Sequence, residues 1–278
     1  MRFVRRNLGK AAEASSGGGG RGLAKEIIVL VGASLALIAG LYFAVGWGVD
    51  RLLPFISFER EQRWFSGLRP ASPHESNGER ADDQLHRVSL LLDRLTALVD
   101  APPLSFSIAI LSEEDPNAFA IPGGTIGVTT GLLEILSDDI ALAFVLGHEL
   151  GHFSNRDHLR GLGRRIGHAL VWTIVFGSSG GDLVGDRLTR FLNLRYSRRQ
   201  EERADAYGLR LVYETYVTVE GTDRLFGWLD QNRDLPAWAA ILSTHPDPMD
   251  RIDKLRRLAN ELATSTEAAS NHHPDRGG

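Results

Sequence analysis

The feature that most constrains this chain is an apolar run, residues 27–49 (IIVLVGASLALIAGLYFAVGWGV), in which no side chain carries a charge. As a helix rising about 1.5 Å per residue, the run would be roughly 34 Å long, enough to cross a hydrocarbon core of about 30 Å. Tyr42 and Trp47 lie toward its C-terminal end, where aromatic side chains favour the membrane interface. The run is longer than the apolar core of a signal peptide, and no A-x-A cleavage site follows it. We therefore expect one transmembrane helix over residues 26–49.

The residues on either side of the run predict its orientation. Before it lie Arg2, Arg5, Arg6, Lys10, Arg21 and Lys25, and after it within a similar distance lie Arg51, Arg60, Arg63 and Arg69. The excess of basic residues on the N-terminal side predicts a cytoplasmic N-terminus and an extracytoplasmic domain, on the periplasmic side in a bacterium. Residues 1–25 contain SSGGGG and no core-forming pattern, so we expect a flexible cytoplasmic tail there.

Residues 50–80 connect the apolar run to the rest of the chain. Their sequence begins RLLPFISFEREQRWF and mixes Leu53, Phe55 and Trp64 with charged residues. Such a juxtamembrane segment can lie along the membrane surface or pack onto the following domain. Both alternatives remain open at the level of sequence.

Composition narrows the chemistry of the remaining chain. The net charge is −4 at pH 7 and the pI is about 6.1, so the chain offers no overall basic field for nucleic acid. It contains no cysteine, which excludes disulfides, thiolate nucleophiles and cysteine metal ligands. We expect neither nucleic acid nor nucleotide as a partner.

Hydrophobic periodicity predicts a mostly α-helical α+β domain over residues 81–263. Residues 81–99 carry apolar side chains at helical spacing, and two short strands are predicted in LSFSIAI and NAFAIPGGTIGVT, with Pro122-Gly123-Gly124 interrupting the second. A helix is predicted to begin near Thr130, and helices dominate the sequence after it. The polar end, residues 264–278, is expected to be disordered.

One predicted helix, AFVLGHELGHF, places His148 and His152 four residues apart, with Glu149 directly after the first. Residues i and i+4 share a helix face, so the two histidines can bind one metal ion. Glu149 then lies beside the ion, where its carboxylate can accept a proton from water, as in the H-E-x-x-H helix of zinc peptidases. Gly147 and Gly151 each cost about 1 kcal/mol in mid-helix, which is expected only where another backbone or a substrate comes close.

A catalytic zinc ion needs a third protein ligand and an open position for water. The predicted helix in YSRRQEERADAYGLRLV offers Glu201 and Glu202. Glu201 shares a face with the small residues Ala204 and Gly208, which permit close packing on another helix, whereas Glu202 lies on a mixed polar face. Asp205 follows Glu201 by one turn and can accept a hydrogen bond from a ligand histidine.

HELGH together with SRRQEERAD resembles the gluzincin family that contains the HtpX-type proteases and the CAAX prenyl endopeptidases. The family pattern S-R-x-x-E-x-x-A-D is matched here by Ser197, Arg198, Glu201, Ala204 and Asp205. The stretches NAFAIPGGTIGVTTGLL and STHPDPMDRI are similar to the family as well, so the resemblance covers roughly residues 80–260.

The resemblance implies a gluzincin-type metallopeptidase domain that binds one Zn²⁺ ion per chain. By that analogy His148, His152 and Glu201 ligate zinc, Glu149 is the general base and Asp205 supports a ligand. It also implies a small sheet with an edge strand that receives an extended polypeptide by main-chain pairing. The residues implied in that strand are Asn117, Ala118, Phe119 and Ala120.

The chain departs from these relatives in its apolar content. Between the metal helix and Glu201 the apolar stretch is ALVWTIVFG, residues 169–177. It is too short to span a bilayer, so we expect a packed helix or a lid over the cleft. The departure argues against prenylated membrane substrates and favours a single-anchor branch that acts on misfolded or envelope proteins.

His245 lies in STHPDPMDRI, where Pro246 and Pro248 stiffen the chain and Asp247 can cap a helix that begins at Pro248. We expect His245 to lie within reach of the metal. It could donate a hydrogen bond to the oxyanion of the tetrahedral intermediate, the role that we favour, or occupy the open zinc position. Arg251 could assist the oxyanion or form an ion pair with a nearby aspartate.

The sequence therefore predicts a single-pass membrane protein that is a zinc metalloendopeptidase with polypeptide substrates. The alternative is a membrane-tethered chaperone or assembly factor that binds extended polypeptides and holds a non-catalytic zinc. A structural zinc site has no need of a base at Glu149, which favours the peptidase.

Overall fold

The computed structural model describes residues 19–67, 78–98, 101–177, 195–231, 245 and 248–270. The helices before the sheet are α2 (Gly19–Leu52), the short 3₁₀ helix η1 (Leu53–Phe55), α3 (Phe58–Phe65) and α4 (Gly78–Thr96). The sheet and the helices after it are β1 (Ser107–Leu111), β2 (Ala118–Ile121), β3 (Thr125–Thr129), α5 (Thr130–Ile135), α6 (Asp139–Ser154), α7 (Asp157–Phe176), α9 (Arg198–Tyr216), α10 (Arg224–Gln231) and α12 (Pro248–Ser270). The mostly helical α+β class with a small sheet and one N-terminal apolar helix is therefore confirmed.

Two helices extend past the bounds that the sequence predicted. α2 begins at Gly19, inside the predicted flexible tail, and α12 continues to Ser270, inside the predicted disordered end. Each extension is continuous with a long helix, and adding one residue to an existing helix costs far less free energy than starting a new helix. The rest of the two predicted tails, residues 1–18 and 271–278, lies outside the described residues.

Within the described residues the sheet has three strands in the order β1-β3-β2. β3 pairs with β1 in parallel and with β2 in antiparallel, joining Ala118 to Val128 and Ile121 to Thr125. The predicted break lies between β2 and β3, where Gly123 and Gly124 adopt φ values of 95° and 98° that side chains with a Cβ rarely reach. β2 therefore lies at an edge of the sheet.

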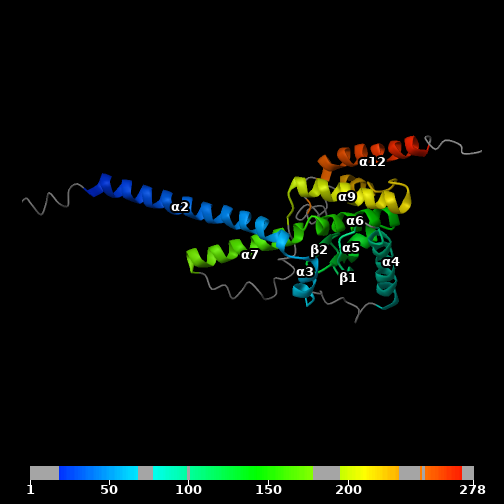
Figure 1. Cartoon of the computed structure of the whole chain (residues 1–278), viewed down its shortest axis with the longest axis horizontal. Helices are drawn as coiled ribbons and strands as arrows, with labels where there is room; N and C mark the ends of the chain where they lie inside the picture. Colours follow the sequence, from blue (N-terminus) through cyan, green and yellow to red (C-terminus); the bar gives the residue numbers. More distant parts are fainter. Residues whose placement is uncertain are drawn as a thin grey trace, which may run out of the picture.

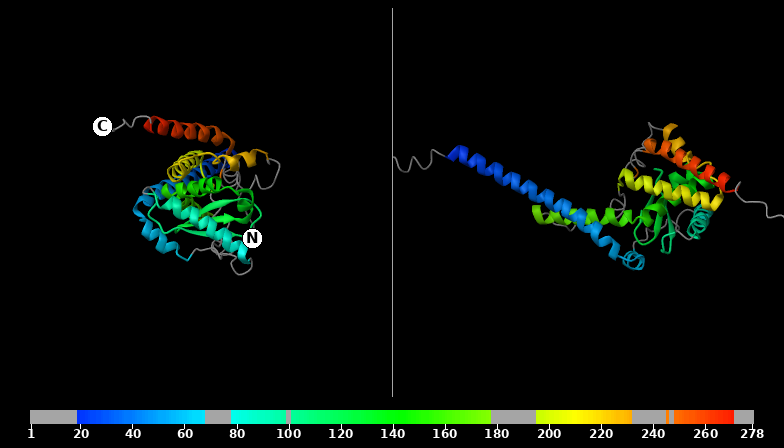
Figure 2. Two further views of the ribbon diagram at one scale, coloured as in Figure 1. Left: turned by 90° about the vertical axis from the view of Figure 1, so that its right-hand side faces the viewer. Right: turned by 45° about the horizontal axis from the view of Figure 1, so that its top comes forward.

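Helix α6 forms the centre of the core. Every residue from Ala141 to Phe153 is buried, because α9 covers one face of α6 while α4 and β2 pack on others. Figure 1 shows α12, α9 and α6 stacked above the sheet, an order that Figure 2 repeats from the side. Asp138 caps α6 by accepting hydrogen bonds from the backbone N–H groups of Ile140 and Ala141 at 3.1 and 2.9 Å.

Helix α2 is, within the described ranges, the one helix that is long and apolar enough to cross a membrane. It projects away from the domain, and α7 runs back along it (Figure 1; Figure 2, right). The apolar stretch 169–177 is thus a helix packed beside α2 up to Phe176, and it does not form a lid over the metal helix.

The juxtamembrane helix α3 is joined to the domain by a buried carboxylate. Glu61 is fully buried; its Oε1 lies 2.6 Å from Nε2 of His158 and accepts a hydrogen bond from the backbone N–H of Gly123 at 3.1 Å. Its Oε2 pairs with the guanidinium of Arg156 at 3.0 Å. The structure therefore shows packing of this segment onto the domain, although Phe55 and Trp64 remain exposed beside it.

These contacts make the ionised form of Glu61 the stable one in the folded protein. Burial alone would raise the pKa of Glu61, but His158, Gly123 and Arg156 together hold it below the ordinary value of 4.5. A carboxyl group with a lowered pKa contributes stability above its unfolded pKa, and that contribution is lost as the pH falls through the folded value.

We predict that Glu61→Ala lowers the free energy of unfolding by about 3–5 kcal/mol at pH 7, because Arg156 and His158 are left buried without their partner. Chemical denaturation of the full chain in detergent measures the change. Glu59→Ala, on the exposed side of the same helix, is the matched control and should be nearly neutral. The gap between Glu61→Ala and the wild type should narrow at a pH below about 4; an equal loss in the two variants would show that Glu61 does not hold α3.

Candidate metal centre

Four buried side chains meet between α6, α9 and the residue that precedes α12. His148 and His152 come from α6, and Glu201 comes from α9. His245 lies three residues before the start of α12. Each offers one ligand atom, and these atoms all lie within 4.8 Å of one another. The structure thus brings together the two histidines and the glutamate that the sequence analysis selected, and His245 with them.

Helices α6 and α9 bring these ligand atoms together because the backbones of the two helices are in direct contact. A Cβ atom on Gly147 would lie 2.9 Å from Cα of Gly208, and one on Gly151 would lie 2.8 Å from Cα of Ala204. A Cβ atom on Gly208 would lie 2.7 Å from the backbone nitrogen of His148. The expectation of a close approach at the two mid-helix glycines is confirmed, and the approaching group is the backbone of α9.

The ligand atoms point toward a common centre. Nε2 of His148 lies 3.1 Å from Nε2 of His152, and Glu201 places one oxygen 3.6 Å from the first ring and the other 3.4 Å from the second. Two imidazoles and a carboxylate at this separation are a donor set that suits a divalent transition metal such as zinc. All three side chains are buried.

Each of the two α6 histidines is held from behind by a carboxylate. Oδ1 of Asp205 lies 2.9 Å from Nδ1 of His148, and Oδ2 of Asp157 lies 3.3 Å from Nδ1 of His152. A carboxylate at Nδ1 orients the ring so that Nε2 faces the centre. Asp157 was not among the residues selected from sequence; its position at the start of the helix after HELGHFSN was the available signal.

A second residue that the sequence analysis did not select is Tyr196. Its ring stacks on that of His152 with a centroid distance of 3.7 Å and an interplanar angle of 18°. Burial, with the nearby carboxylates of Glu149 and Asp157, raises the pKa of Tyr196 well above its ordinary value. Tyr196 therefore stays neutral, and its ring packs against one face of the His152 ring.

Arg251 of α12 holds the two acidic residues of α9 in place. Its Nε donates to Oδ2 of Asp205 at 2.7 Å, and its terminal nitrogens contact Asp205 and Glu201. Burial alone would raise the pKa of the Asp205 carboxyl, but Arg251 and His148 lower it. Of the two alternatives for Arg251, the ion pair with an aspartate is the arrangement seen.

His245 contacts the same group of side chains. Its Nδ1 lies 3.2 Å from both carboxylate oxygens of Glu201 and 3.3 Å from Nε2 of His148. Its Nε2 lies 3.4 Å from the carbonyl oxygen of Ala118 and 3.6 Å from Oε1 of Glu149. α12 begins at Pro248 as expected, whereas the predicted cap Asp247 lies outside the described residues.

Glu149 is almost fully buried beside this group. Its Oε2 has no hydrogen-bond partner among the described residues. A buried carboxylate oxygen is normally satisfied by protein or by ordered water. The orphaned oxygen therefore indicates a place where water or a substrate group completes the site.

The protonation of the four side chains follows from their mutual contacts. Burial favours a neutral ring, but Asp157 and Glu201 raise the pKa of His152 to about 9. Burial opposes the charge of Glu201 as well, yet His245, His152 and Arg251 hold its pKa well below the ordinary value. The site thus keeps an ionised carboxylate among histidines and is electrostatically suited to a cation.

The predicted edge strand begins at the metal centre. The carbonyl oxygen of Ala118 approaches His245, and the backbone N–H and C=O of Asn117 bond to Thr129. Phe119 packs its ring over Gly127 of β3, and Ala120 is fully buried. Hence the strand lies beside the candidate ligands, although its side chains belong to the core.

We predict that Gly208→Ala separates α6 from α9, because the added Cβ meets the backbone of His148 and neither main chain can yield without shifting the ligands. The expected cost is about 1–3 kcal/mol of unfolding free energy, with a fall in the metal bound per chain. Gly227→Ala on α10 is the control, since a Cβ there meets nothing within 4 Å. Normal metal content in Gly208→Ala, measured by atomic emission, would contradict the role of this contact.

Comparison with known proteins agrees with this geometry. The profile of peptidase family M48 matches residues 80–259. The mitochondrial metalloendopeptidase OMA1 of Arabidopsis thaliana is 34% identical over 163 residues, covering 57% of this chain and 32% of that protein. A protease HtpX homolog of Thermococcus kodakarensis is 29% identical over 56% of this chain and 68% of its own length. The metalloprotease LoiP of Escherichia coli is 25% identical over 61% of this chain and 68% of its own length. The matched region spans 32% to 56% of the length of the OMA1 proteins of Arabidopsis thaliana, Saccharomyces cerevisiae and Schizosaccharomyces pombe.

Proposed function

Because the chain belongs to peptidase family M48, we propose that it is a membrane-anchored zinc metalloendopeptidase. The observation that carries the proposal is the meeting of His148, His152 and Glu201 next to a buried Glu149 whose Oε2 has no partner in the described chain. A family match alone does not require these atoms to converge. Their convergence supplies both a metal site and a base.

We assign metal binding to Nε2 of His148, Nε2 of His152 and the carboxylate of Glu201. The absence of cysteine and the His₂Glu donor set favour zinc, with one ion per chain. When bound, zinc supplies Lewis-acid chemistry, polarising the scissile carbonyl and making water acidic enough to lose a proton near neutral pH.

Glu149 acts as the general base in this proposal. Its unpartnered Oε2 accepts a proton from the attacking water, and the same carboxyl group then donates that proton to the leaving amine. Because Glu149 neighbours His148 on the same helix, the carboxylate is held beside the metal ligands throughout the reaction.

The remaining polar residues position the ligands. Asp205 and Asp157 orient the histidines, and Arg251 balances the charge of Asp205 and Glu201. We therefore assign Arg251 to positioning, since the oxyanion role would require its guanidinium to leave two buried carboxylates.

The substrate in this proposal is an extended segment of a misfolded or envelope protein. The strand containing Asn117, Ala118, Phe119 and Ala120 starts at the metal centre and lies at the sheet edge. Pairing with the main chain of such a strand depends little on side-chain identity. Following the flanking charges, the N-terminus is cytoplasmic and the catalytic domain extracytoplasmic.

A membrane-tethered chaperone that binds extended polypeptides is the second candidate. The edge strand beside the centre is the observation that favours it. Binding alone would leave a polypeptide intact, so degradation of casein with and without a chelator separates the two functions.

We predict that Glu149→Gln abolishes casein cleavage, by at least 1,000-fold, while zinc remains near one ion per chain, because the amide cannot accept the proton and the ligands are untouched. Peptidase assays and metal analysis on the same purified protein measure both quantities. Substantial turnover by zinc-loaded Glu149→Gln would remove Glu149 from the mechanism.

Two further variants serve as controls for the metal. Glu201→Ala should lose zinc as well as activity, whereas Glu202→Ala should retain both, because Glu202 points away from the centre to Lys254 on α12. Equal zinc loss from the two would show that the third ligand is misassigned.

His245 lies where a fourth metal ligand or a water molecule would be. Its Nδ1 is as close to Glu201 and His148 as those residues are to one another. This position favours the second of the two roles considered for His245: it occupies the open coordination position in the resting enzyme and leaves no room there for water.

We predict that His245→Ala raises casein cleavage several-fold, because the side chain that competes with water is removed. Initial rates at equal zinc loading measure the effect. A fall in rate at unchanged zinc would instead support hydrogen bonding to the oxyanion.

A further inference from the structure

The C-terminal half of α7 exposes an apolar face beside α2. The residues that form it are Ile166, Leu170, Trp172, Ile174 and Val175, and Ile174 is 81% exposed. α2 exposes apolar side chains along its whole length in the same way. Two neighbouring helices with continuous exposed apolar surface are expected in hydrocarbon and are costly in water.

The two helices are packed in antiparallel register by small residues. A Cβ atom on Gly163 would lie 3.1 Å from Cγ1 of Val49, and one on Gly167 would lie 2.4 Å from Cγ1 of Val45. Glycines four residues apart that let a neighbouring helix approach are typical of helix pairs in membranes.

The depth of α7 follows from this register. Deeper along α2, the ring of His168 stacks on Tyr42 at 3.9 Å, and α7 continues for two more turns to Phe176. If the membrane boundary lies at Asp50, which ends the charge-free run of α2, the segment from Arg165 to Phe176 would reach roughly 16 Å into the bilayer, about half of the hydrocarbon core.

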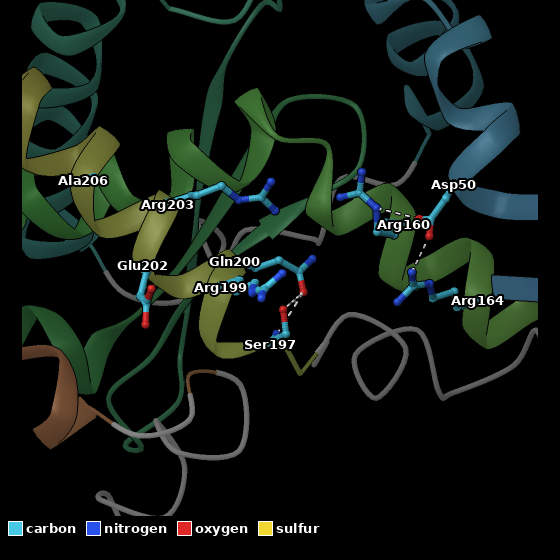
Figure 3. Close-up of a pocket in the computed structure, with 9 residues that line it drawn as sticks. All are labelled: Asp50, Arg160, Arg164, Ser197, Arg199, Gln200, Glu202, Arg203 and Ala206. Carbon is cyan, nitrogen blue, oxygen red and sulfur yellow. Dashed lines mark hydrogen bonds and ion pairs between the residues drawn. The ribbon is translucent and has the colours of Figure 1, made fainter. Parts of the chain in front are cut away.

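An arginine-rich cavity opens where the two helices leave the apolar level. Asp50 accepts from Arg160 at 2.9 Å and from Arg164 at 2.7 Å (Figure 3). The cavity has a volume of about 690 Å³, and Arg199 and Arg203 from the first turns of α9 complete its basic lining. With the membrane boundary at Asp50, the cavity would lie at the level of lipid headgroups, at the foot of the α2–α7 pair.

Four arginines line the cavity against two carboxylates, so its positive charge is only partly neutralised from within. Its two carboxylates are already engaged, Asp50 by the arginines of α7 and Glu202 by Lys254. Arg199 has no ion pair within the described chain, and Arg203 is 3.7 Å from the carboxylate of Asp157 that Arg160 contacts more closely. Such a lining attracts an anion with several acceptor oxygens, and arginine is well suited to phosphate.

We propose that the foot of the α2–α7 pair is a binding site for an anionic phospholipid. The phosphate and the acidic headgroup lie in the cavity against Arg164 and Arg199, and the acyl chains lie along the exposed apolar face of α7. The arginine-lined cavity lies directly next to the apolar face of α7, just as the charged headgroup of a lipid lies next to its acyl chains. The site is separate from the metal centre and does not depend on peptidase activity.

The test uses the full chain in an uncharged detergent, with native mass spectrometry to count bound lipid. Phosphatidylglycerol should bind and phosphatidylcholine should bind at least tenfold more weakly. The double variant Arg164→Gln/Arg199→Gln should weaken the binding of phosphatidylglycerol about 10–30-fold, because each basic residue near the headgroup contributes about a factor of ten or less to the affinity. The control Arg94→Gln/Arg210→Gln removes the same charge from positions of α4 and α9 that do not line the cavity and should leave binding unchanged.

Other outcomes would overturn the proposal. Equal weakening by the two double variants would indicate a general charge effect, and displacement of the lipid by equimolar inorganic phosphate would indicate a free-anion site. Because Arg164 also pairs with Asp50, Arg199→Gln alone is the check on folding. It leaves the α2–α7 contact intact and should still weaken binding several-fold, and an unchanged affinity would overturn the assignment of the cavity.

The position of α7 can be tested separately because the chain has no cysteine. In nanodiscs, Ile174→Cys should resist a water-soluble maleimide as strongly as Leu35→Cys on α2. Leu90→Cys, exposed on α4, should react at least tenfold faster. Rapid labelling of Ile174→Cys would place α7 in water and remove the acyl-chain half of the site.

Discussion

The structure depends first on the contact between the backbones of α6 and α9. With a side chain at Gly147, Gly151 or Gly208, the helices would stand further apart, and a carboxylate on α9 could not reach the rings on α6. Helix packing with ordinary side chains leaves 8–10 Å between axes, and glycines permit the lower end of that range. Glycine destabilises a helix, but at these positions it allows the close contact that brings the ligands together.

Around this contact, charges are arranged in alternating layers. The histidines meet Glu201 in the centre, Asp205 and Asp157 stand behind the rings, and Arg251 stands behind the acids. Each buried charge has an opposite neighbour, which offsets the cost of removing it from water. The arrangement also joins separate helices, so the ligand geometry relies on α12 as well as on α6 and α9.

The same logic links the centre to the membrane side of the molecule. Asp157, which contacts His152, is the first residue of α7, and the other end of α7 lies along α2. α3 is joined nearby through Glu61 to Arg156 and His158, the residues on either side of Asp157. A series of contacts thus runs from α2 through one short segment to a ring at the metal centre.

Much of this was readable along the chain, because it rests on local periodicity and spacing. The apolar run, the strand break at Gly123-Gly124, and the shared helix face of His148 and His152 depend on residues close in sequence. The expected positions of Glu201 and Glu202 on different faces of one helix likewise depend only on their spacing in the sequence. What the sequence by itself determined was therefore the mostly helical class, the apolar anchor helix and the residues able to meet at a metal.

Only the tertiary structure decided how distant elements meet. Asp157 and Tyr196 could not be selected, because their value comes from lying against His152 rather than from any motif. The orientation of Arg251 toward two carboxylates and the position of His245 among the ligands depend on where α12 packs. The apolar half of α7 has the same composition whether it packs as a lid or beside α2. It packs on α2 because Gly163 and Gly167 fit against Val49 and Val45. This complementarity between two helix surfaces cannot be read from either segment of sequence alone.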